Sequence, residues 1–176
     1  MDIQITVALI AATASFLGLL ISKEQRVSEF RQEWINRVRI DVASLIGQAS
    51  HLANSWALLE KKYIKDKSIG NKFLNEKIIV FQEMDVLISR IKLSLNPEKD
   101  SELFAALDVL EESSMSPDAF SNLSDAANEV EKLAHLTFKT EWERVKKGEP
   151  LYQITKNTCG VITLLITIYL LSNSVN

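Results

Sequence analysis

Residues 27–63 read VSEFRQEWINRVRIDVASLIGQASHLANSWALLEKKY, and the spacing of apolar side chains in this stretch decides the fold class. Apolar side chains recur every three or four residues, which is the period of one face of an α-helix. Gly47 is tolerated inside such a helix at a cost of about 1 kcal/mol. We therefore predict a continuous helix from Ile3 to about Lys65. The stripe consists of Val27, Phe30, Trp34, Val38, Val42, Leu45, Ala49, Leu52, Trp56, Leu59 and Tyr63.

Three more amphipathic helices are predicted after a turn at residues 66–71. Asn96–Pro97 ends the first of them and starts the next, with Asn96 as the N-cap and Pro at the first helical position. Residues 116–118 repeat this start signal. Because no run of alternating apolar and polar residues indicates a strand, we predict an all-α protein. Its polar part, residues 23–156, is expected to form an antiparallel helical bundle with a long N-terminal stalk helix.

Two almost uncharged segments flank the predicted bundle. Residues 3–22 and 157–175 contain no Asp, Glu, Lys or Arg. Because a helix needs about 20 apolar residues to cross a bilayer core, both segments are predicted to be transmembrane helices. For residues 3–22 the alternative is a buried core helix. A cleaved signal peptide does not fit, because the basic residues follow the apolar segment instead of preceding it.

Basic residues near the two segments predict their orientation. Five Lys and Arg residues lie in residues 23–39, five lie in residues 139–156, and the terminal segments carry none. We therefore expect a protein of the bacterial inner membrane, in contact with the lipid bilayer. Residues 23–156 would face the cytoplasm, and both termini would lie outside.

Small and polar side chains form a stripe in each uncharged segment. Such side chains let membrane helices approach closely and hydrogen-bond to each other. They are candidates for helix packing or pore lining in a homo-oligomer. The alternatives are packing of the two segments within one chain, or hydroxyl groups bonded to their own helix. The candidates are Gln4, Ala8, Ala11, Ser15, Gly18, Ser22, Thr155, Cys159, Thr163 and Thr167.

Charge is unevenly distributed along the predicted bundle. Residues 96–131 hold ten acidic residues and one lysine, which suggests a surface for a basic cytoplasmic protein partner. Solvated helix faces are the alternative. The candidate partner-binding acids are Asp108, Glu111 and Glu112.

A cluster of lysines lies at the end of the first long helix. Such a cluster could hold a phosphate-bearing ligand or nucleic acid. It could equally be a solvated helix end, where cations suit the helix dipole. With a net charge of −3 for the whole chain, direct nucleic-acid binding is not expected. The lysines are Lys61, Lys62, Lys65, Lys67 and Lys72.

The residue types needed for catalysis are sparse in this chain. His51 and His135 lie beside helical stripes, so we predict buried, hydrogen-bonded core histidines rather than metal ligands. Cys159 lies in an apolar segment, where a low-pKa thiolate is not expected. The five glycines form no phosphate-binding loop. We expect no enzymatic activity, no cofactor and no metal site.

Three sequence blocks resemble a known group of proteins: FRQEWINRVRIDVASLIG at residues 30–47, RIKLSLNP at 90–97 and EWERVKKGEP at 141–150. They are similar to small two-span bacterial membrane proteins found in anti-phage defence loci, such as the membrane effectors of Hailong-type systems. The resemblance implies an oligomeric membrane channel that assembles with a nucleotidyltransferase-like partner. Such a channel would perturb the membrane when a cytoplasmic signal or a partner releases it. No site residue carries over from it.

Two other functions fit the same residues. One is a membrane-tethered helical scaffold that recruits a soluble partner. The other is a holin-like lysis protein, although the large polar region exceeds what pore formation alone needs.

Overall fold

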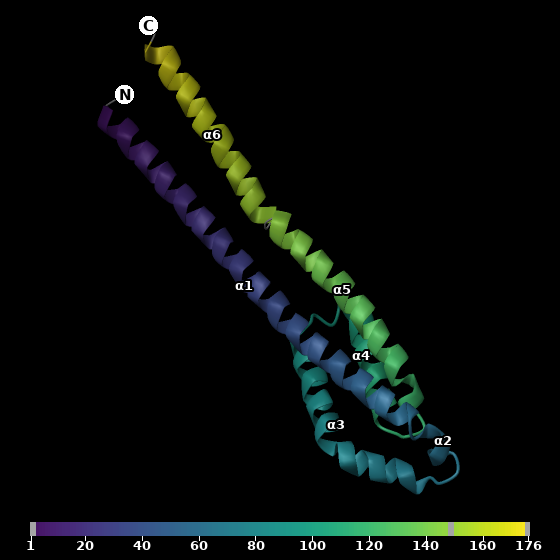
Figure 1. The fold of residues 1–176 in the computed structure, drawn as a ribbon. Coiled ribbons are helices and arrows are strands. Elements are labelled where there is room, and N and C mark those ends of the chain that lie inside the picture. The colour runs from purple at the N-terminus through teal and green to yellow at the C-terminus, as the bar shows by residue number, and fades with distance from the viewer. Residues whose placement is uncertain (1–2, 148–149, 175–176) are drawn as a thin grey trace. The chain divides into compact units, whose positions relative to one another are not determined.

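The computed structural model describes residues 3–147 and 150–174, and every regular element in these ranges is helical (Figure 1). The prediction of an all-α protein is confirmed. The elements are α1 (Ile3–Ala57), α2 (Glu60–Tyr63), α3 (Ser68–Ser94), α4 (Ser101–Ser114), the 3₁₀ turn η1 (Phe120–Asn122), α5 (Leu123–Lys147) and α6 (Pro150–Ser174).

The chain divides into two compact units. One unit is Trp34–Glu141, and the other combines Met1–Glu33 with Trp142–Asn176. The unit Trp34–Glu141 is called the bundle. It confirms the prediction of a helical bundle. Within it, α5 runs antiparallel to α1, and α3 and α4 complete the core (Figure 1).

The side of α1 that the apolar spacing predicts is buried in the core of the bundle. Ile35 is also buried there, at 2% exposure, although the predicted stripe did not include it. Phe30, which the stripe did include, is 71% exposed and belongs to the other unit. The period of the helix identifies a face, but it does not show where the packing partners of that face begin. The predicted stripe residues buried on α1 are Val38, Val42, Leu45, Ala49, Leu52 and Trp56.

An aromatic cluster closes the end of the bundle at which α1 stops. The ring centroid of Trp56 lies 4.9 Å from that of Tyr63, 5.2 Å from Phe73 and 5.1 Å from Phe120. Phe81 stacks on Phe120 at 5.4 Å. Such pairs stabilise a fold by roughly 0.5–1.5 kcal/mol each beyond the area that they bury. The cluster therefore joins α1 to α2, α3 and η1.

The first long helix is shorter than predicted. α1 ends at Ala57 instead of near Lys65. The N–H of Leu59 donates to the carbonyl of Trp56 at 2.7 Å, which closes the helix with a tight turn. The short helix α2 follows directly and turns Tyr63 back into the aromatic cluster.

The start of α4 also differs from the prediction. The helix begins at Ser101, and Asp100 rather than Asn96 occupies the N-cap position. Asn96 instead organises the preceding turn, where its Oδ1 accepts the N–H groups of Glu98 and Lys99 at 3.0 and 3.2 Å. The side chain is thus used in a local turn, as Asn side chains often are.

Two polar contacts hold α3 alongside α1 near the start of the bundle. Arg90 Nη2 lies 3.1 Å from Oδ1 of Asp41, whose side chain is only 11% exposed. Trp34 Nε1 donates to the carbonyl of Ser94 at 2.8 Å. A buried charge usually requires a partner, and the pair of Arg90 with Asp41 supplies one contact between α3 and α1.

The predicted membrane location is corrected by the structure. Within the described residues, no helix has an apolar stretch long enough to cross a membrane. A spanning helix needs about 20 predominantly apolar residues. The prediction of an inner-membrane protein with both termini outside is therefore wrong, and transmembrane helices at residues 3–22 and 157–175 are not confirmed.

A substitution at Gly70 tests the packing of the loop before η1 against α3. A Cβ at this position would lie 2.8 Å from Pro117 Cγ and 2.8 Å from Tyr63 Cε2. We expect Gly70→Ala to lower the free energy of unfolding by about 1–3 kcal/mol, because both rings must shift. Chemical denaturation measures the change. A Gly70→Ala variant as stable as the parent chain would contradict this packing.

Candidate binding surface

The described residues hold no group of three or more His, Cys, Asp and Glu side chains that could bind a metal ion. His51 and His135 are both exposed, which corrects the prediction of buried core histidines. In each case the neighbouring residue is buried in the core. Leu52 is buried beside His51 on α1, and Ala134 is buried beside His135 on α5. His51 Nε2 lies 3.4 Å from Lys77 Nζ, so its neighbour is a surface cation.

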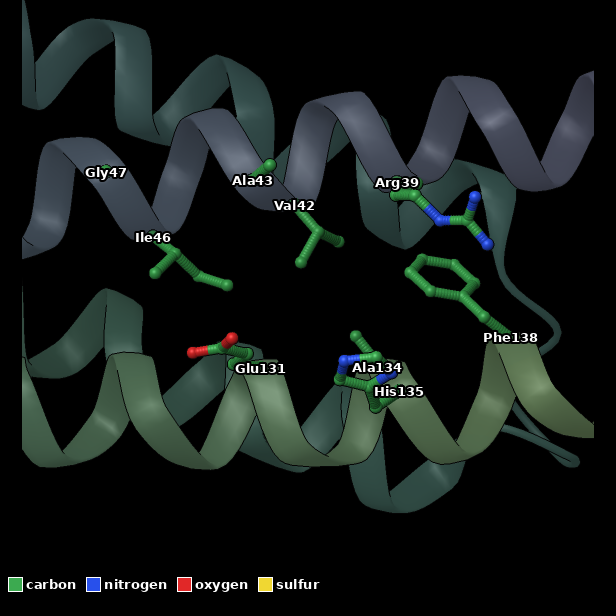
Figure 2. Close-up of a pocket in the computed structure, with 9 residues that line it drawn as sticks. All are labelled: Arg39, Val42, Ala43, Ile46, Gly47, Glu131, Ala134, His135 and Phe138. Atoms are coloured by element: carbon green, nitrogen blue, oxygen red, sulfur yellow. The ribbon is translucent and has the colours of Figure 1, made fainter.

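A groove with a volume of about 350 Å³ opens between α1 and α5 (Figure 2). Aliphatic side chains of α1 form one wall. Phe138 of α5 lies at one end, where the guanidinium carbon of Arg39 is 5.6 Å from the ring centroid. Figure 2 shows Glu131 near the other end, across from Ile46. The lining residues are Arg39, Val42, Ala43, Ile46, Gly47, Glu131, Ala134, His135 and Phe138.

A second groove, with a volume of about 400 Å³, lies between α1 and α3. The amide Nε2 of Gln48 donates to Glu83 Oε2 at 3.0 Å across this groove. The Oε1 of Gln48 is buried and has no hydrogen-bond partner within the described residues. Ile79 and Val86 of α3 are 67% and 57% exposed. The lining residues are Ser44, Gln48, Ile79, Gln82, Glu83, Val86, Leu87 and Arg90.

Between the two grooves, α1 exposes a ridge made of Ile40, Ala43, Ser44 and Gly47. At 3.6 residues per turn these positions share one side of the helix, opposite to the buried stripe. Ile40 is 66% exposed, and apart from the adjacent turns of α1 itself, no atom of the described residues lies within 4 Å of a Cβ built at Gly47. Three of the four side chains are small, so the backbone of α1 is accessible along the ridge. The ridge and the two grooves together are named the α1 face.

Charge separates along the α1 face. Arg39 and Arg90 lie at the end near Asp41, to which Arg90 is paired. Glu83 lies at the other end, beside Gln48, and Glu131 lies at that end of the neighbouring groove. Within the described residues, neither Arg39 nor Glu131 forms an ion pair. The α1 face is therefore basic at one end and acidic at the other.

The lysine cluster predicted from the sequence is only partly brought together. Lys67 Nζ lies 2.7 Å from Asp118 Oδ1 and 3.9 Å from the ring centroid of Tyr63. The hydrogen bond to Asp118 raises the pKa of Lys67, and the same bond lowers the pKa of Asp118. Lys72 lies 3.9 Å from Glu76 on its own helix. The other three lysines, Lys61, Lys62 and Lys65, are exposed, and ligand binding by the cluster stays a prediction.

The predicted acidic partner site is partly occupied by a cation of the same chain. Lys92 Nζ lies 2.6 Å from both Asp108 Oδ1 and Glu111 Oε2, which joins α3 to α4. Burial alone would lower the pKa of Lys92, but the two hydrogen bonds outweigh it and raise the pKa. Burial, followed by repulsion from Glu111, raises the pKa of Asp85. Glu112 is exposed on α4, and a basic partner for these acids stays a prediction.

The small and polar candidates at the two ends of the chain lie on α1 and α6. Ser15 Oγ donates to the carbonyl of Ala11 at 2.8 Å, and Thr163 Oγ1 donates to that of Cys159 at 2.8 Å. These hydroxyl groups bond to their own helices, as one of the alternatives expected. The structure does not describe the side chain of Thr167. Gln4, Ala8, Ala11, Ser15, Gly18, Ser22 and Thr163 are exposed, and Thr155 and Cys159 are partly exposed.

The sequence prediction missed the α1 face itself. Its residues come from three helices, and the spacing within one helix cannot bring them together. One signal was present, because Gly47 interrupts an otherwise strong helix-forming pattern. The structure shows no contact within the chain that requires a glycine at this position.

The comparisons with known proteins are negative. No protein-family model matches the chain, and neither a curated protein nor a solved structure matches it. The resemblance to membrane effectors of anti-phage defence therefore stays a prediction from three sequence blocks.

Replacing Gly47 by alanine tests whether the ridge is open in the folded chain. Because a Cβ at this position meets nothing within 4 Å, the methyl group should fit without strain. Glycine in an exposed helix interior is less stable than alanine by roughly 0.5–1 kcal/mol. We expect Gly47→Ala to raise the free energy of unfolding by about that amount in chemical denaturation. A loss of stability that is the same at every protein concentration would show that the ridge is filled within the chain.

Asp118 Oδ1 accepts hydrogen bonds from Lys67 Nζ at 2.7 Å and from the Tyr63 hydroxyl at 2.8 Å, and this arrangement predicts a pH dependence. The folded pKa of Asp118 lies below its ordinary value of 3.8, so its contribution to stability is present above pH 3.8. That contribution is lost as the pH falls through the lowered folded pKa. Asp118→Asn should therefore lose less thermal stability than the parent chain between neutral pH and about pH 2.

The matched control for this titration is Glu112→Gln, which alters an exposed carboxyl of α4. Its thermal midpoint should follow the parent chain at every pH. If Asp118→Asn loses as much stability on acidification as the parent does, the pair with Lys67 does not stabilise the fold.

Proposed function

We propose that this chain is a helical scaffold that binds another protein chain through the α1 face. The supporting observation is the exposed ridge of small side chains on α1 between two open grooves. Helices dock into apolar grooves of this kind through one amphipathic face. The proposal follows the scaffold alternative from the sequence, without a membrane tether.

The exposed apolar side chains next to the grooves favour a protein ligand. Ile40, Ile79 and Val86 are each more than half exposed, at 66%, 67% and 57%, and they come from two neighbouring helices. Single exposed apolar residues are ordinary, but a group of them beside open grooves is typical of interaction sites. Covering these side chains would add to the affinity of a docked helix.

The chemistry of the α1 face supports binding rather than catalysis. Aliphatic side chains and the Phe138 ring form most of the first groove, and amides and aliphatic chains form most of the second. Charged groups lie toward the ends of the face, where they would orient a ligand. A solvated His135 beside Glu131 does not by itself form a catalytic pair, because neither is held by a further buried group.

Site-specific photo-crosslinking tests this function. We expect Ser44→p-benzoylphenylalanine to form a protein–protein adduct on irradiation of cells that express the chain. The matched control is Ala105→p-benzoylphenylalanine, on the exposed side of α4, which lines neither groove. The adduct from position 44 should exceed that from position 105 several-fold on denaturing gels. Equal yields from the two positions would contradict binding through the α1 face.

A further inference from the structure

We propose that the protein bound at the α1 face is a second copy of this chain, docked antiparallel about a two-fold axis at Ala43–Ser44. This inference rests on the proposed function, because it names the occupant of the same face. Three properties of the face favour a second copy over an unrelated partner: its charge distribution, the shape of its ridge and its width.

The charge distribution of the α1 face is self-complementary. A two-fold interface places the same surface patch of both copies in contact, in opposite directions. The basic end with Arg39 and Arg90 then lies against the acidic end of the second copy, and the reverse contact repeats it. The axis at Ala43–Ser44 lies between Arg39 and the level of Ile46, across the groove from which Glu131 lies. Two symmetric contacts between Arg39 and Glu131 follow.

Other arrangements of charge fit the face less well. A parallel second copy would place the two basic ends against each other, with Arg39 of one copy facing Arg90 of the other, and a partner of one charge sign would meet repulsion at one end. Like charges brought together at an interface repel each other, and this repulsion rejects wrong partners. Lys77 lies beyond the acidic end, next to His51, and lines neither groove. The observed charge distribution therefore favours a partner that places an acidic end against Arg39 and a basic end against Glu131.

The shape of the ridge is also self-complementary. With the axis between Ala43 and Ser44, Ile40 of each copy lies opposite Gly47 of the other. Ile40 is a large side chain at 66% exposure, whereas the space above Gly47 is empty within 4 Å. The isoleucine of one copy can fill the space that the glycine of the other leaves open. This packing explains a glycine that no contact inside the chain requires.

The width of the face is compatible with a stable interface. A standard interface covers roughly 800 Å² on each partner, which is more than the ridge of a single helix provides. The α1 face extends over α1, α3 and α5, and Ile79 and Val86 border its second groove. An antiparallel copy on the ridge would cover these side chains on both subunits.

The decisive experiment uses charge reversal on the 176-residue chain, with sedimentation velocity as the measurement. We expect the parent chain to sediment as a dimer. Arg39→Glu and Glu131→Arg should each weaken self-association at least about tenfold, because each creates two repulsive contacts. An equimolar mixture of the two variants should restore the dimer. In the mixed pair, the two carboxylates of the Arg39→Glu copy meet the two guanidinium groups of the Glu131→Arg copy.

Two further variants separate this interface from effects on folding. Gly47→Leu should abolish the dimer while leaving the helical circular dichroism signal intact, because the leucine blocks Ile40 of the other copy. Glu102→Arg, at an exposed position of α4 outside the face, should leave self-association unchanged. Circular dichroism of both charge variants checks that the bundle still forms.

The outcomes distinguish the two proposals. A parent chain that is monomeric at all concentrations, or a mixture that does not restore the dimer, overturns the second copy as occupant. If a monomeric chain still forms an adduct from position 44 with a different protein, the proposed function stands and only this inference fails. If there is neither a dimer nor an adduct, both fail.

Discussion

The burial of one side of α1 is the constraint on which the rest of the bundle depends. Leu45, Leu52 and Trp56 are at most 2% exposed, and the aromatic cluster around Trp56 joins this side to α2, α3 and η1. Because a helix has 3.6 residues per turn, burial of one side forces the opposite side outward. The ridge from Ile40 to Gly47 is therefore a direct consequence of the core. The grooves follow where α3 and α5 flank that ridge.

Polar contacts determine where the flanking helices lie along α1. The carboxylate of Asp41 is nearly buried and is paired with Arg90 at 3.1 Å. Removal of the arginine would leave the Asp41 carboxylate without its ion-pair partner. The same pair places Arg90 at the basic end of the α1 face. One contact thus supports the fold and orders the charges of the proposed interface.

Much of the fold could be predicted from helical period, and the errors have physical causes. The predicted stripe residues Leu45 and Leu52 are fully buried, since apolar spacing reports the face of a helix directly. Phe30 follows the same spacing but is exposed, because spacing does not show where the packing partners begin. Asn96 was misplaced as an N-cap, since a side chain that can cap a helix can also cap a turn. His51 is exposed, whereas Leu52 beside it is buried. The helical period alone does not distinguish well between two neighbouring positions at the edge of an apolar stripe.

The sequence by itself determined that this chain is helical and which side of α1 is apolar. Both depend on neighbours three or four residues apart, so local spacing contains them. Only the tertiary structure decided that Arg39, Arg90, Glu83 and Glu131 share one face with Gly47. These residues lie far apart in the chain on three different helices. They share a face because α3 and α5 pack against α1 at particular positions along its length. The buried core and the pair of Asp41 with Arg90 contribute to those positions.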